Sequence, residues 1–104
     1  MQRIGFKMKL LKGKEDEYKK RHDEIWGELK ELLKQTGIKD YSIFLDEKTN
    51  DLFAYLTIND ETKLDELANE AVMKKWWNYM IDIMETNEDN SPVVAPLKEV
   101  FYLP

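Results

Sequence analysis

The stretch DYSIFLDEKTNDLFAYLTI, residues 40–58, decides the fold of this chain. Its two ends, residues 40–46 and 52–58, are apolar and β-prone, and each predicts a strand. The five residues between them, EKTND, are turn formers. The stretch therefore predicts an antiparallel hairpin.

Both strands of this hairpin carry apolar side chains on both faces. In the second strand Leu52, Ala54, Leu56 and Ile58 face one way, while an aromatic pair, Phe53 and Tyr55, faces the other. One layer of helices covers only one face of an open sheet. Because the chain is short, the simplest way to cover the second face is to pack it against another copy of the chain.

The remaining elements follow outward from the hairpin. Residues 3–11 alternate as a strand with one side buried, and residues 15–35 change to the helical period. Asn59 or Asp60 caps a helix, and a further helical stretch covers residues 71–84. After a turn-rich loop at 87–96, residues 97–103 form the last strand. The order β-α-β-β-α-β predicts an α+β, ferredoxin-like antiparallel sheet, and two such sheets packed face to face form a dimeric α+β barrel.

Composition narrows the class of protein. The length of 104 residues predicts one domain, residues 1–104, and 42% hydrophobic with 36% charged residues is typical of a globular chain. A net charge of −5 with scattered lysines argues against nucleic-acid binding. No apolar run is long enough for a membrane span, the N-terminus does not resemble a signal peptide, and there is no cysteine. We therefore expect a cytoplasmic protein.

The residue types also limit the chemistry. One histidine, no cysteine and no suitably spaced acidic residues give no metal motif, and the four glycines form no phosphate-binding loop or nucleophile elbow. These residues argue against a metal site, phosphoryl transfer, dinucleotide chemistry and triad hydrolysis. Acid–base chemistry or simple binding remains.

His22 is the one histidine, and it lies on the apolar stripe of the first predicted helix. It is either a core histidine whose nitrogens are satisfied by neighbours or a proton donor near neutral pH. Tyr18 lies one turn earlier on the same face, so both side chains can line one pocket. Arg21 and Asp23 flank His22 off the stripe, and we expect them in solvated salt bridges.

Trp76 and Trp77 are adjacent in a predicted helix, where neighbouring side chains diverge by about 100°. They either pack in a core or interface, or form a platform for the apolar face of a sugar ring, with an indole N–H for a hydroxyl. Tyr41 opens the second strand as a half-buried strand residue or as a ligand contact. Both alternatives stay open at each of these positions.

Several segments resemble the L-rhamnose mutarotase family over the full length of the chain. They are YKKRHDEIW (18–26), KDYSIFLD (39–46), WWNYMIDIMETNEDNSPV (76–93) and LKEVFYLP (97–104). The combination of RH, WW and DNSP at these separations is more specific than any one motif. The resemblance implies a dimeric α+β barrel, a homodimer free of metal and cofactor, in L-rhamnose catabolism. It also implies that His22 is the proton donor and that Tyr18, Tyr41, Trp76 and Trp77 bind the sugar.

The function expected from this resemblance is exchange of the α and β anomers of L-rhamnose. Ring opening needs a proton delivered to the ring oxygen and another removed from the anomeric hydroxyl, by a tyrosine, a carboxylate or a water as base. Three other functions suit the same pattern. They are a cofactor-independent monooxygenase of this barrel fold, a non-catalytic ligand-binding or regulatory domain, and a purely structural dimer module.

Overall fold

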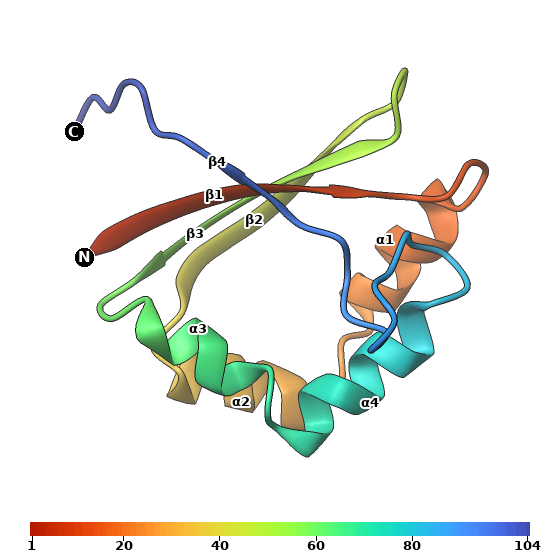
Figure 1. Ribbon diagram of the computed structural model, residues 1–104, viewed down its shortest axis with the longest axis horizontal. Coiled ribbons are helices and arrows are strands. Elements are labelled where there is room, and N and C mark those ends of the chain that lie inside the picture. The colour runs from red at the N-terminus through yellow and green to blue at the C-terminus, as the bar shows by residue number, and fades with distance from the viewer.

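The computed structural model describes residues 1–104 and contains one antiparallel sheet with helices on one side (Figure 1). Its elements are β1 (Gln2–Lys9), α1 (Glu15–Asp23), α2 (Gly27–Gln35), β2 (Lys39–Asp46), β3 (Asp51–Ile58), α3 (Thr62–Leu67), α4 (Ala71–Met80) and β4 (Ala95–Leu97). The strands lie in the order β2-β3-β1-β4, and all three pairings are antiparallel. The predicted ferredoxin-like α+β sheet is therefore confirmed. None of the helices combines the length and apolar character needed to cross a membrane.

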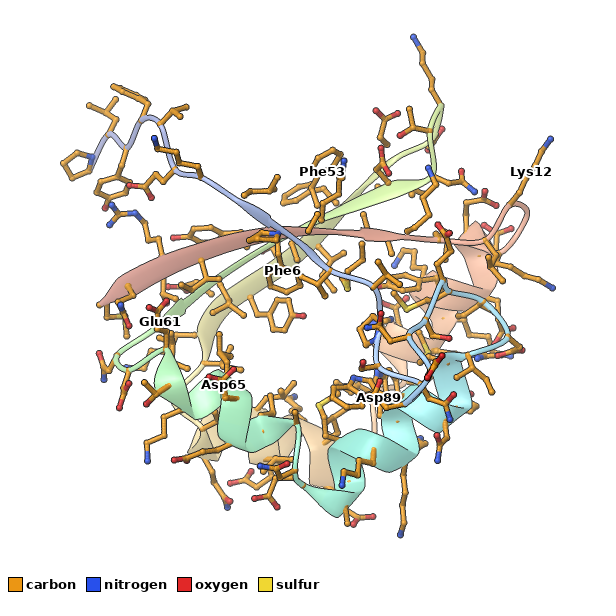
Figure 2. All side chains as sticks on the ribbon, viewed as in Figure 1. Phe6, Lys12, Phe53, Glu61, Asp65 and Asp89 are labelled. Carbon is orange, nitrogen blue, oxygen red and sulfur yellow. The ribbon has the colours of Figure 1, made fainter.

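The two faces of the sheet have different surroundings, as the alternation along β3 predicts. The register pairs Phe6 of β1 with Ala54 of β3, so these side chains share the face that the helices cover. On that face Leu52 and Ile58 are fully buried. Figure 2 shows Phe6 on the helix side and Phe53 on the opposite side of the sheet. The opposite face is left uncovered.

The predicted helix over residues 15–35 is wrong in one respect, because it is two helices. α1 ends at Asp23 and α2 begins at Gly27. Glycine disfavours a helix interior, which makes this a ready place for a break. The break brings the ring of Trp26 to 5.1 Å from that of Trp76 and 5.5 Å from that of Tyr79. The packing of the Trp26 ring against these two rings therefore offsets the lost helical turn.

The C-terminal half also differs from its predicted boundaries. α4 ends at Met80 rather than at residue 84, and residues 81–83 form a turn. The last strand is Ala95–Leu97, not residues 97–103. It pairs with β1 over three residues, from Lys7↔Ala95 to Gly5↔Leu97. Residues 98–104 form no strand, although β1 continues to Gln2 beyond its last pair with β4.

Candidate active site

A cavity of about 80 Å³, partly open to solvent, lies between the inner face of the sheet and the helices. A cavity of this size has room for several water molecules, so it is more than a packing defect. All five predicted site residues line it: Tyr18 and His22 from α1, Tyr41 from β2, and Trp76 and Trp77 from α4. Three elements far apart in the sequence thus converge on one volume.

His22 is held in place by the turn of α1 that precedes it. Its ring stacks on that of Tyr18, with centroids 4.2 Å apart, and meets the Trp76 ring edge-on at 5.5 Å. Its Nδ1 lies 3.0 Å from the carbonyl oxygen of Tyr18. Burial lowers the pKa of His22 below its usual 6.5, and the Tyr18 carbonyl and the nearby Asp23 only partly oppose this shift. The imidazole is therefore neutral at pH 7.

The two tyrosines of the cavity remain protonated. Burial raises the pKa of Tyr41 to about 12. Burial also raises the pKa of Tyr18, and the nearby Tyr41 phenol adds to the shift. Tyr41 lines the cavity, and although 39% of its surface is exposed, the protein around its hydroxyl raises the pKa. At neutral pH both hydroxyls are hydrogen-bond donors and acceptors, not bases.

The tryptophan pair diverges around α4, and yet both rings reach the cavity. Trp76 is buried and packs at the same time against Trp26 and Tyr79, at 5.1 and 5.7 Å between ring centroids. Trp77 is half-buried. Trp76 thus belongs both to the hydrophobic core and to the cavity wall, so the two interpretations drawn from the sequence are not exclusive.

An apolar part of the wall was not predicted from the sequence. It consists of Ile43 and of four methionines: Met8, Met73, Met80 and Met84. In the sequence, Met73, Met80 and Met84 continue the helical spacing of the tryptophans, although Met84 lies beyond the end of α4. This spacing is the signal that could have identified them. Methionine side chains adapt their shape to what they contact, so this wall suits an apolar group of a ligand.

The loop after α4 supplies a polar part of the wall that sequence reasoning also missed. Thr86, Asn90 and Pro92 line the cavity. The sequence signal for Asn90 and Pro92 is the DNSP motif at residues 89–92, whose letters alone indicate no role, and Thr86 lies outside this motif. No aspartate or glutamate lines the cavity, and nowhere in the chain do three or more potential metal-ligating side chains cluster.

Arg21 is less exposed than expected. Its side chain is 10% exposed and forms a two-pronged ion pair with Asp82, at 2.9 and 3.1 Å, besides its bond to Glu17. Nη1 also donates a hydrogen bond to the carbonyl oxygen of Tyr79 at 2.7 Å. Asp23 behaves as expected, in an exposed salt bridge to Lys19. Arg21 therefore links α1, which carries His22, to the end of α4.

Sequence comparisons match this chain to one protein family over nearly its whole length. The family model described as L-rhamnose mutarotase matches residues 3–103. An L-rhamnose mutarotase of Formosa agariphila is 54% identical over 103 residues, 99% of each chain.

Two solved structures share the fold of this chain, and one of them is a member of the same family. The crystal structure of L-rhamnose mutarotase from Formosa agariphila superposes with a TM-score of 0.93 at 53% identity over the full length of both chains. A crystal structure of an antibiotic biosynthesis monooxygenase, 15% identical with a TM-score of 0.61 over 96% of this chain and 99% of that one, shares the fold alone. Since a family model and a relative more than half identical both match nearly every residue, the chain belongs to the L-rhamnose mutarotase family.

Proposed function

We propose that this protein is an isomerase that interconverts the α and β anomers of L-rhamnose by acid–base-catalysed ring opening and closure. The observation that carries the proposal is the convergence of His22, two protonated phenols and two indoles on one cavity of a chain that belongs to this family. The reaction needs only two proton transfers and rotation about one bond of the open aldehyde. It therefore requires neither a cofactor nor a metal.

In this mechanism His22 delivers the proton to the ring oxygen of the sugar. Its Nδ1 faces a carbonyl oxygen, which only accepts hydrogen bonds, so Nδ1 carries the proton of the neutral ring. Nε2 is then the nitrogen that exchanges protons with the ligand. A neutral Nε2 must first take up a proton, and the anomeric hydroxyl of the sugar is one source.

The sequence did not identify the base that removes the anomeric proton. The residues that line the cavity reduce the number of candidates. The raised pKa values of Tyr18 and Tyr41 argue against a tyrosinate, and no carboxylate lines the cavity. The candidates that remain are a water molecule and Nε2 of His22 itself. Because the anomeric and ring oxygens are bonded to the same carbon, one nitrogen can serve both in turn.

The other lining residues bind and orient the sugar in this proposal. Indole rings offer a flat apolar surface for the C–H face of a pyranose and an N–H for a hydroxyl. Trp76 and Trp77 fill this role, while Tyr18 and Tyr41 present their hydroxyls to the sugar. The methionine wall suits the 6-methyl group that distinguishes a 6-deoxy sugar.

The experiment that tests this function is saturation transfer by proton NMR on L-rhamnose at equilibrium near neutral pH. One anomeric signal is saturated, and the transfer to the other is followed as the protein concentration rises. Transfer in proportion to protein concentration supports the proposal. Transfer with another aldose but not with L-rhamnose would mean that the other sugar is the substrate. No transfer with any aldose would contradict the mutarotase activity.

We propose further that the working form is a homodimer, in which two sheets pack with their uncovered faces together. The uncovered face carries exposed aromatic side chains beside Lys7 of β1: Phe44 is 68% exposed, and Phe53 lies between Phe44 and Lys7. Tyr55 and Leu97 flank Gly5 in the next row of the same face. A large exposed apolar patch on a small chain marks an interface, and a second copy matches it by symmetry.

The C-terminal segment, residues 98–104, supports the same proposal. Val100, Phe101 and Leu103 have 87%, 78% and 78% of their surfaces exposed, although all three are apolar. The segment is held near β1 by Arg3, which forms two 2.8 Å bonds to the carboxylate of Glu99 and lies 3.5 Å over the ring of Tyr102. An anchored apolar arm is suited to cover the sheet of a second copy. The cytoplasmic location and the role in L-rhamnose catabolism stay predictions.

A further inference from the structure

The DNSP motif forms a closed loop that places Asn90 and Pro92 against the cavity, and Asn90 is the polar one of the two. The loop ends pair through Thr86↔Pro92, and the backbone N–H of Asn87 donates to the carbonyl oxygen of Ser91 at 2.7 Å. The carboxylate of Asp89 accepts a hydrogen bond from the backbone N–H of Ser91 at 3.0 Å. These bonds are internal to the loop, so its conformation does not depend on a ligand.

Asn90 has a conformation that few side chains tolerate. Its φ is 71°, in the left-handed region, where asparagine is among the few residues other than glycine that occur routinely. Asn90 lines the cavity in this conformation. The side-chain Nδ2 donates a 2.7 Å hydrogen bond to Oδ1 of Asn78 on α4, directly after Trp77. This bond fixes the amide and leaves Oδ1 of Asn90 as its unused end.

Apart from the Asn90 amide and the His22 imidazole, the side-chain acceptors on the cavity wall are the hydroxyls of Tyr18, Tyr41 and Thr86, each of which can also donate. The indole N–H groups of Trp76 and Trp77 only donate, and the wall contains no carboxylate. Each hydroxyl of a sugar donates one hydrogen bond, and therefore needs an acceptor once it leaves water. His22 is engaged with the reacting oxygens in the proposed mechanism. The amide oxygen of Asn90 is then a fixed acceptor for another part of the ring.

We propose that Asn90 is a specificity-determining residue, whose Oδ1 accepts a hydrogen bond from one ring hydroxyl of the sugar other than the anomeric one. The proposal rests on the proposed mutarotase activity. Asn78 is its positioning residue, because it orients the amide without contacting the sugar. A pocket built to bind a hydroxyl discriminates against a substrate that lacks it, since the acceptor is then left unpaired.

The test compares anomer exchange by proton NMR for L-rhamnose and for its three analogues that lack the hydroxyl at carbon 2, 3 or 4. In the wild-type protein, we expect the analogue without the recognised hydroxyl to exchange about tenfold more slowly than the other two. Asn90→Gly removes the amide while retaining a residue that accepts a φ of 71°. It should exchange L-rhamnose about tenfold more slowly and lose the discrimination.

Asn90→Asp is the matched control, because it keeps an oxygen acceptor and tolerates the same backbone conformation. The amide of Asn78 can rotate to donate to the new carboxylate, so this variant should keep the discrimination. The proposed role of Asn90 would be wrong if Asn90→Gly slowed the exchange of all four sugars equally or slowed none of them. It would also be wrong if Asn90→Asp lost the discrimination between the analogues. A wild-type protein that exchanges no aldose would overturn the mutarotase activity itself, and the two failures are thereby distinguished.

Discussion

The Nδ1 atom of His22 lies 3.0 Å from the carbonyl oxygen of Tyr18, one turn earlier on the same helix. The rings of the two residues also stack, with centroids 4.2 Å apart. Since a carbonyl oxygen accepts and does not donate, this contact fixes the tautomer that carries its proton on Nδ1. The helix that positions the imidazole therefore also selects Nε2 as the reactive nitrogen.

Replacing His22 by asparagine tests this assignment. The asparagine amide can still donate to the Tyr18 carbonyl, but it cannot carry a proton to the sugar. We expect the rate of anomer exchange by His22→Asn to fall by about 10²–10⁴-fold, the usual contribution of a positioned general acid. The circular dichroism spectrum should not change. A rate within a few-fold of wild type in a folded variant would mean that His22 is a core residue without a catalytic role.

The lowered pKa of His22 predicts a pH dependence of stability. Because the folded protein binds the proton less tightly than the unfolded chain, where the pKa is about 6.5, protonation favours unfolding. The stabilising contribution is complete above pH 6.5 and declines as the pH falls toward the folded-state pKa. The free energy of unfolding in urea should therefore decrease from pH 7.5 to pH 5.5.

His22→Asn provides the control for that experiment, because His22 is the one histidine of the chain. The variant should lose less stability than wild type over the same interval. Equal pH dependence in the two proteins would show that His22 does not cause the change. A wild-type protein more stable at pH 5.5 than at pH 7.5 would contradict the predicted direction of the pH dependence.

Tyr41 should act as a hydrogen-bonding group and not as the base. Its pKa of about 12 keeps the phenol protonated at neutral pH. We expect Tyr41→Phe to reduce kcat/KM by about tenfold, the value of one hydrogen bond, and to leave the shape of its pH profile between pH 6 and 9 unchanged. Tyr79→Phe, which alters a phenol that does not line the cavity, is the matched control. Loss of an ionisation from the Tyr41→Phe profile would identify this phenol as the base.

The uncovered sheet face predicts an effect on assembly. Phe53→Lys places a charge in the middle of this face, beside Phe44 and Lys7, and symmetry places it there twice in a dimer. We expect sedimentation velocity to show a dimer for wild type and a monomer for Phe53→Lys at the same concentration. Lys30→Ala, an exposed change on α2, should remain dimeric. A wild-type monomer would refute the proposed homodimer, and a dimeric Phe53→Lys would place the interface elsewhere.

How far the sequence predicts this fold is clear from β3. Its alternation separates Leu52, Ala54, Leu56 and Ile58 from Phe53 and Tyr55, and the structure buries the first set and exposes the second. The residue period specifies the face of a strand, so this part was predictable. The same argument placed Tyr18 and His22 on one side of a helix.

The parts that were not predicted depend on contacts distant in sequence. The break before Gly27 depends on Trp26 reaching Trp76 and Tyr79, and no local pattern reports that contact. The last strand ends at Leu97 although β1 continues beside it to Gln2, so strand propensity alone does not determine which residues pair. The position of Asn90 against the cavity follows from the closure of its loop, which the DNSP letters do not show. That residues 1–104 function as one mutarotase domain stays a prediction.

The guanidinium of Arg21 is the polar link between the helix of His22 and the end of α4, and we expect it to stabilise the fold. It is 10% exposed, bonds to both carboxylate oxygens of Asp82 and to the carbonyl oxygen of Tyr79, and lies 4.4 Å over the Tyr79 ring. Arg21→Met keeps the apolar stem but removes these charged hydrogen bonds, so urea unfolding should show a loss of about 1–3 kcal/mol. Lys19→Met removes an exposed salt bridge on the same helix and should cost about 0–1 kcal/mol. Equal losses in the two variants would mean that Arg21 is an ordinary solvated charge, as its position off the apolar stripe had suggested, and that packing alone holds α1 against α4.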